Sequence, residues 1–181
     1  MKTLIVNTPR SGGNALAIKL AASIPSLYVL NPFDGTGRNI IPPDAEKIIV
    51  KSDILYPDDN EFGSIFPVNI QLRLKFLSNV AKDYDEIVLL DRRDTIAQIE
   101  SYAHALSKHT GLRVSDVLNT PYIYDSSAIS KDTFETAKRE VSDSKITIKK
   151  LSYKLKVPIT YYEDIFNQHS NERYRKIGPL I

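Results

Sequence analysis

Short apolar runs separated by polar, turn-forming segments recur along the chain. Four of them cover residues 3–6, 27–30, 47–51 and 87–90. Each has a continuously apolar centre rather than an alternating pattern, which is typical of strands buried on both faces of a parallel sheet. A fifth strand is expected at 157–162, so the pattern predicts a sheet of about five strands.

Between these strands, apolar residues recur three and four positions apart, as they do on one face of a helix. This spacing predicts helices over 15–24 and about 68–83, with further helices beginning near Asp94 and Asp132. Asp132 and Glu135 have the spacing of a capping box. The apolar stripes of the last three helices are Ile70, Leu74, Leu77 and Ala81, then Ile96, Ile99, Ala103 and Leu106, then Phe134, Ala137, Val141, Ile148, Leu151 and Leu155.

Strands that alternate with helices predict an α/β fold. We expect a single three-layer domain over residues 1–181, with a mainly parallel sheet of about five strands flanked by helices. Ligands of such sheets bind beyond the carboxyl ends of the strands. Several loops that leave these ends carry polar clusters, so a site is expected there. The loops at 31–46, 52–68 and 110–130 are expected to surround a substrate.

Composition and charge exclude several classes of protein. The chain has 42% hydrophobic and 25% charged residues, which argues against disorder. It has no cysteine, so a disulfide framework, a thiol nucleophile and a cysteine-ligated zinc are excluded. A net charge of +2 does not favour a nucleic-acid partner, and the longest apolar run near the start of the sequence, Leu4-Ile5-Val6, is far too short to span a membrane. We expect a soluble, cytoplasmic protein, with the lysines from Lys145 to Lys156 on a solvated helix face.

Residues 8–14 form a glycine-containing loop between the first strand and the first helix. Glycine lets the backbone approach an anion closely, and the N–H groups of a helix start attract negative charge. The loop therefore predicts a site for phosphate or sulfate oxygens; the alternative is an ordinary strand-to-helix turn with Asn14 as the N-cap. The residues expected to contact the anion are Arg10, Ser11, Gly12, Gly13 and Asn14.

The loop is not a Walker A motif, because no Gly-Lys-Ser or Gly-Lys-Thr occurs in the sequence. Pro9-Arg10-Ser11-Gly12-Gly13-Asn14 instead resembles the 5′-phosphosulfate loop of sulfotransferases that use 3′-phosphoadenosine 5′-phosphosulfate (PAPS). Arg93 and Ser101, eight residues apart, match the pair that binds the 3′-phosphate in that family. Tyr162-Glu163-Asp164-Ile165 is similar to a Tyr-Glu-Asp-Leu segment whose tyrosine lies near the nucleotide.

The resemblance implies a P-loop-like sulfotransferase fold, closest to small bacterial-type members, with Tyr162 beside the nucleotide. Each of these residues also has a plainer interpretation. Arg92 and Arg93 can pair with Asp91, Asp94 or Glu100 on the surface. Tyr162 can pack in the core at the end of its strand. Near the end of the sequence, Arg175-Lys176-Ile177-Gly178 is similar to a family segment that contacts the 3′-phosphate, or is a solvated basic tail.

Sulfuryl transfer needs a general base for the acceptor but no metal. Two carboxylates fit this role by their place in the family pattern: Asp34, which follows the second strand, and Asp53, which follows the third. Lys51 would then stabilise the charge on the bridging oxygen. Otherwise Asp34 is a turn residue, Asp53 caps a strand end, and Lys51 is a surface lysine at a strand edge.

The resemblance implies transfer of the sulfuryl group from PAPS to a hydroxyl or amine of a small molecule, carbohydrate or other acceptor, without a metal. Two alternatives from other classes stay open. One is a nucleotide-binding module that keeps the loops but has no working base. The other is a divergent phosphotransferase that uses ATP or GTP with magnesium. The sequence specifies neither the acceptor nor the oligomeric state.

Overall fold

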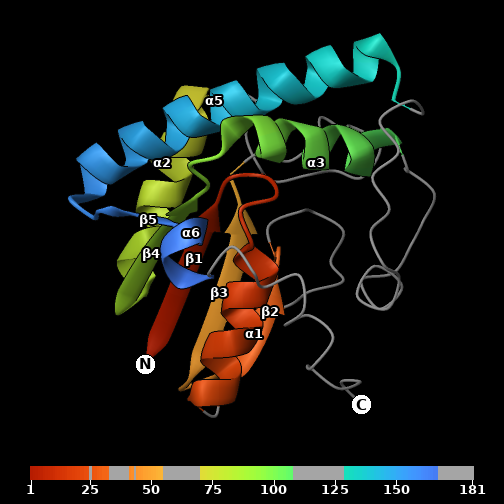
Figure 1. The fold of residues 1–181 in the computed structure, drawn as a ribbon. Coiled ribbons are helices and arrows are strands. Elements are labelled where there is room, and N and C mark those ends of the chain that lie inside the picture. Colours follow the sequence, from red (N-terminus) through yellow and green to blue (C-terminus); the bar gives the residue numbers. More distant parts are fainter. Residues whose placement is uncertain (25, 33–40, 43, 55–69, 108–128, 167–181) are drawn as a thin grey trace.

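A parallel β-sheet forms the centre of the structure, a computed structural model (Figure 1). The residues that it describes are 1–24, 26–32, 41–42, 44–54, 70–107 and 129–166. The strands are β1 (Lys2–Asn7), β2 (Leu27–Leu30), β3 (Ile48–Asp53), β4 (Glu86–Asp91) and β5 (Ile159–Tyr161). They lie in the order β2-β3-β1-β4-β5, and each neighbouring pair is parallel. The prediction of an α/β fold with a parallel sheet of five strands is confirmed.

Helices cover both faces of this sheet (Figure 1). They are α1 (Gly13–Ser23), α2 (Ile70–Val80), α3 (Thr95–Ser107), α5 (Lys131–Leu155) and the short α6 (Tyr162–Ile165), with a 3₁₀ turn, η2, at Ala81–Asp83. α1 and α6 lie on one face, and α2 and the second half of α5 lie on the other. α3 lies beyond the carboxyl end of the sheet and packs on the first half of α5.

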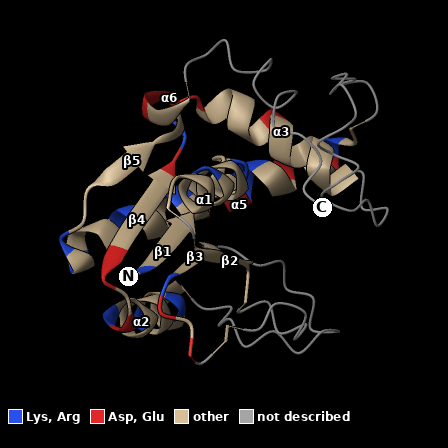
Figure 2. Ribbon diagram, turned by 90° about the horizontal axis from the view of Figure 1, so that it is seen from below, with Lys and Arg blue, Asp and Glu red and all other residues tan. Residues whose placement is uncertain are grey.

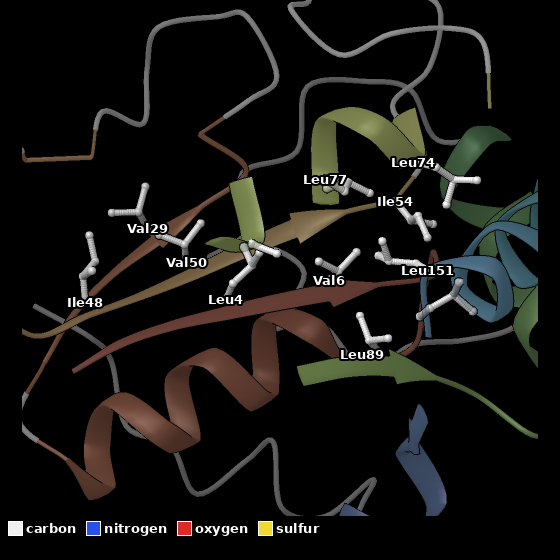
Figure 3. Close-up of a cluster of buried hydrophobic side chains, with 12 residues drawn as sticks. Leu4, Val6, Val29, Ile48, Val50, Ile54, Leu74, Leu77, Leu89 and Leu151 are labelled. Carbon is white, nitrogen blue, oxygen red and sulfur yellow. The ribbon is translucent and has the colours of Figure 1, made fainter. Parts of the chain in front are cut away.

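Alternate residues of the central strand β1 supply the two halves of the core. Leu4 and Val6 face the layer of α2 and α5, where they join Leu77 and Leu151 (Figure 3). Ile5 faces α1 and packs with Leu16. All three β1 side chains are fully buried. Burial on both faces explains why this strand is continuously apolar rather than alternating.

The structure differs from the predictions at three informative places, two of them at the end of an element and one in the burial of a side chain. β3 continues to Asp53, so this carboxylate ends the strand rather than following it. The N-cap of α5 is Ser130, whose side chain accepts a hydrogen bond from the Thr133 N–H, and not Asp132. Ile96 does not belong to a buried stripe: it is 70% exposed, because α3 leaves the sheet and contacts α5 through other residues.

The prediction that the lysines from Lys145 to Lys156 lie on a solvated helix face is wrong at Lys145. The side chain of Lys145 is only 17% exposed and pairs with Asp91 at the end of β4. The sequence carries the signal, since Lys145 stands four residues after Val141 and three before Ile148, in the apolar stripe of α5. In the described part of the chain, no helix has both the length and the apolar character to cross a membrane.

Candidate functional site

The loops after β1 and β4 meet at the carboxyl end of the sheet. These two strands are neighbours, but the chain after β1 leads to β2 at one edge and the chain after β4 leads to β5 at the other. Such a reversal leaves a crevice between the two loops, and ligands of open α/β sheets bind there. Here the Thr8 N–H donates to the Leu90 carbonyl at 3.0 Å, which joins the start of one loop to the end of β4.

The β1–α1 loop, residues 8–12, turns through two left-handed backbone positions. Arg10 has a φ of 57° and Gly12 a φ of 84°. Gly12 is the N-cap of α1 and has no side chain to accept hydrogen bonds from the first turn of the helix. The N–H groups at this helix start therefore face the carboxyl end of the sheet without an N-cap side chain over them. That is the arrangement an anion site requires.

Gly13 is the first residue of α1, and two side chains approach it closely. A Cβ atom there would stand 2.5 Å from Asn7 Oδ1 and 2.9 Å from Lys51 Cε. Because position 13 has no side chain, the aliphatic part of Lys51 can lie against the start of the helix. Asn14 lies within the first turn of α1, so the alternative interpretation of Asn14 as the N-cap is wrong.

Lys51 and Asp53 form a linked pair at the end of β3. Lys51 Nζ lies 2.6 Å from Asp53 Oδ2 and donates to Asn31 Oδ1 at 3.0 Å. The other oxygen of the Asp53 carboxylate accepts from Asn7 Nδ2 at 2.6 Å. Lys51 is 3% exposed, so it is not a surface lysine at a strand edge. The structure therefore brings one of the two predicted bases and the predicted lysine together beside the β1–α1 loop.

Arg93 and Ser101, the predicted pair, have different partners in the structure. Arg93 makes a two-pronged ion pair with Asp164, at 2.6 and 2.8 Å, and its guanidinium lies over the ring of Tyr161. The hydroxyl of Ser101 instead accepts from Nε of Arg10 at 3.0 Å. The cation beside Ser101 in this structure is thus the arginine of the β1–α1 loop. Ion pairing with Asp164 raises the pKa of Arg93.

Short helix α6 lies against both loops. Tyr162 stands over the N-cap of α1: a Cβ on Gly12 would lie 2.7 Å from its ring. The guanidinium of Arg92 lies 5.3 Å from the centre of the same ring. Tyr162 therefore lies beside the β1–α1 loop, and it is partly exposed. Figure 2 shows the acidic residues of α6 beside the basic residues that follow β4.

The carboxylate of Glu163 binds the backbone directly before α3. It accepts hydrogen bonds from the backbone N–H of Arg93 at 3.0 and 3.1 Å and from that of Asp94 at 3.2 Å. Burial alone raises the pKa of Glu163, but these hydrogen bonds and the charge of Arg92 outweigh it, so the pKa is lowered overall. The first turn of α3 is capped by Asp94, whose Oδ1 accepts from the Ala97 N–H at 2.9 Å, whereas the N-cap of α1, Gly12, has no side chain that could do so.

Sequence reasoning missed a set of polar residues beneath the β1–α1 loop, three of them buried and one partly exposed. They are Thr8, Asp91, Gln98 and Lys145. The Ser11 hydroxyl also points inward, donating to the Thr8 carbonyl at 2.7 Å, so it shapes the loop rather than offering a donor outward. The position of Asp91, at the end of an apolar run, is a signal that could have been used.

Several predicted positions lie outside the described residues. Among them are Asp34, the second candidate base, and the basic segment at 175–178. Most of the loops expected around a substrate also fall there. Within the described residues, no three His, Asp or Glu side chains gather where they could hold a metal ion.

Comparisons with models of protein families, with curated proteins and with solved structures found no match for this chain. What the site can do therefore follows from its own residues. Those residues offer backbone N–H donors at a helix start, two nearby cations, Arg10 and Lys51, and one partly exposed carboxylate, Asp53. Such a set can bind an anionic group and accept a proton beside it.

Proposed function

We propose that the chain is a PAPS-dependent sulfotransferase with a P-loop-like fold. The observation that carries the proposal is the start of α1, where Gly12 caps the helix without a side chain and Lys51 lies against Gly13. Backbone donors, a helix dipole and a lysine side chain thus lie at the same helix start, which suits the phosphosulfate end of PAPS. Arg10 adds a guanidinium fork at the same loop.

In the proposed reaction, an acceptor oxygen bonds to sulfur while the bond from sulfur to the 5′-phosphate oxygen breaks. The acceptor proton passes to a carboxylate, and Asp53 is the candidate within the described residues. Lys51 serves the oxygen that leaves with the nucleotide. Since Lys51 Nζ now holds Asp53 Oδ2 at 2.6 Å, moving this ammonium toward the donor would free the carboxylate to accept the proton.

The first test is thermal unfolding with 3′-phosphoadenosine 5′-phosphate (PAP), the nucleotide product, compared with ADP, ATP and GTP. A ligand at about 100 times its dissociation constant stabilises a protein by about 2.7 kcal/mol. We expect a shift with PAP that does not depend on magnesium. A shift with ATP or GTP that requires magnesium would support a phosphotransferase instead and contradict the proposal.

Arg10→Ala should weaken binding of PAP by about tenfold or more, because a charged hydrogen bond contributes about 1.5–3 kcal/mol. The matched control is Lys47→Ala, which removes one positive charge at the amino end of β3, away from the loop. Titration calorimetry gives both dissociation constants. Equal affinities in the two variants would remove Arg10 from the site.

One observation favours a second candidate, a nucleotide-binding module without catalysis. Both oxygens of the Asp53 carboxylate are engaged, one by Asn7 and the other by Lys51. A single-turnover assay with labelled PAPS and a panel of hydroxyl and amine acceptors separates the two functions. Binding of PAP without transfer to any acceptor would favour the module.

A further inference from the structure

Three buried polar side chains, Thr8, Asp91 and Gln98, and the partly exposed Lys145 form a connected network beneath the β1–α1 loop. Thr8 Oγ1 donates to Asp91 Oδ1 at 2.7 Å and accepts from Gln98 Nε2 at 2.8 Å. The same amide nitrogen of Gln98 donates to the Pro9 carbonyl at 2.6 Å. Lys145 Nζ donates to both oxygens of Asp91 at 3.1 Å and also to the Arg92 carbonyl. The network thus joins the loop to β4, α3 and α5.

The burial of this network is unusual for polar groups. Thr8 and Gln98 are fully buried, and Asp91 is 3% exposed. A buried ion pair such as Lys145–Asp91 seldom adds stability beyond what well-packed apolar side chains would provide, because both charges lose their water. Its presence here therefore points to a need for a particular geometry, which we locate in the loop that it holds.

That loop has a conformation which needs outside support. Arg10 adopts a left-handed φ of 57° although it is not glycine. Strained positions of this kind persist where the surrounding structure fixes them, and they gather at functional sites. The Gln98 hydrogen bond to Pro9 acts on the residue directly before Arg10. The network is thus placed to set the direction of Arg10 and of the N–H groups that follow.

We infer that Gln98, Asp91 and Lys145, acting through Thr8, are positioning residues that hold the β1–α1 loop in its anion-binding conformation. The identity of the anion rests on the proposed function, but the holding of the loop does not. Binding by a loop that is already ordered costs less than binding by one that must be ordered first. Loss of the network should therefore weaken anion binding without removing any group that touches the anion.

Gln98→Met tests this inference, since methionine has a similar length but no N–H donors. The matched control is Ser144→Ala, a buried residue beside Lys145 whose hydroxyl donates only within α5, to Val141. Hydrogen exchange without ligand should be at least about tenfold faster at residues 10–14 in Gln98→Met and unchanged there in the control. Exchange in β3 should be the same in both variants. The dissociation constant for PAP should rise about tenfold in Gln98→Met alone.

The outcomes separate this inference from the proposed function. Unchanged exchange at residues 10–14 overturns the inference, and so does faster exchange with unchanged affinity for PAP. If the wild-type protein does not bind PAP, the proposed function fails, and the exchange result still decides whether the network holds the loop. If Gln98→Met does not fold, Thr8→Val replaces it, with Thr8→Ser as the conservative variant that should restore slow exchange.

Discussion

At the scale of single residues, Gly13 shows how a missing side chain shapes the site. The helix start can approach Lys51 and Asn7 only because no Cβ stands between them. Its neighbour Gly12 serves a different purpose, since its backbone is left-handed and the ring of Tyr162 covers it. Close contacts thus favour glycine at position 13, and the left-handed backbone favours glycine at position 12.

Gly13→Ala should destabilise the fold by about 1–3 kcal/mol, because the new methyl group would overlap Asn7 and Lys51. Urea unfolding measures this loss. Ala22→Ser, at an exposed position of the same helix, is the control and should change stability by less than about 0.5 kcal/mol. Because Asn7→Ala removes the nearest atom, the double variant should lose less than the sum of the single variants. Strict additivity would mean that the overlap with Asn7 is not the cause.

The site residues were predicted unequally well, and the reason is the range of the interactions. The β1–α1 loop is a local motif, so its residues could be identified from neighbours in the sequence. The partner of Ser101 could not, because Arg10 lies 91 residues away. Arg93 likewise pairs with Asp164, 71 residues later, rather than with a residue of its own helix. Long-range pairing of charges has no signature in a single sequence.

At the scale of elements, the long helix α5 depends on its first turn. The Ser130 hydroxyl accepts from the Thr133 N–H at 3.1 Å, which satisfies one of the N–H groups that a helix start leaves unpaired. Ser130→Ala should therefore lower the free energy of unfolding by about 1 kcal/mol. Asp132→Ala, in the same turn but without the cap, is the control for the loss of a polar side chain. No loss of stability in Ser130→Ala would contradict the cap, whereas any loss in Asp132→Ala reports the charge near the helix start.

The hydrogen bonds of Glu163 to the backbone before α3 predict a dependence of stability on pH. Because the pKa of Glu163 is lowered in the folded protein, its ionised form stabilises the fold above the unfolded pKa of about 4.3. This contribution is lost as pH falls from there through the folded pKa. Glu163→Gln should thus be less stable than wild type at pH 7, with a difference that shrinks below about pH 4.

Denaturant unfolding at several pH values checks this prediction. Glu135→Gln is the matched control, because Glu135 lies on the exposed surface of α5 and pairs only weakly with Lys138, at 3.9 Å. It should show little difference from wild type at either pH. A Glu163→Gln variant whose deficit stays constant from pH 7 to about pH 3 would contradict a role for the ionised carboxylate.

At the scale of the whole molecule, the order of the strands fixes where a ligand meets the chain. Since β1 and β4 are neighbours with diverging connections, a bound nucleotide should contact the loops after both. We expect PAP to slow hydrogen exchange at residues 10–14 and at 93–96 together. α2, on the far layer, should not change. Protection confined to one loop would argue against a nucleotide lying across the crevice.

The overall architecture was predictable because buried strands and amphipathic helices can be recognised from the pattern of their own residues. The apolar centres of β1, β3 and β4 and the stripe of α2 gave the correct layers. The errors fall where tertiary contacts override the local pattern. Ile96 is exposed because α3 turns away from the sheet, and Lys145 is only 17% exposed because it pairs with Asp91. The short helix α6 has too few residues for a periodic signal.

The central place of β1 also has a consequence for how the protein is made. Its two neighbours are β3, where Ile48 lies opposite Lys2, and β4, where Glu86 lies opposite Thr3. Both strands emerge from the ribosome after β1. Until they arrive, the central strand, whose Leu4, Ile5 and Val6 are fully buried in the folded protein, has two open edges. Chains with such distant pairings fold slowly and risk aggregation meanwhile. A nascent chain that ends before residue 86 should therefore be the form most dependent on chaperones.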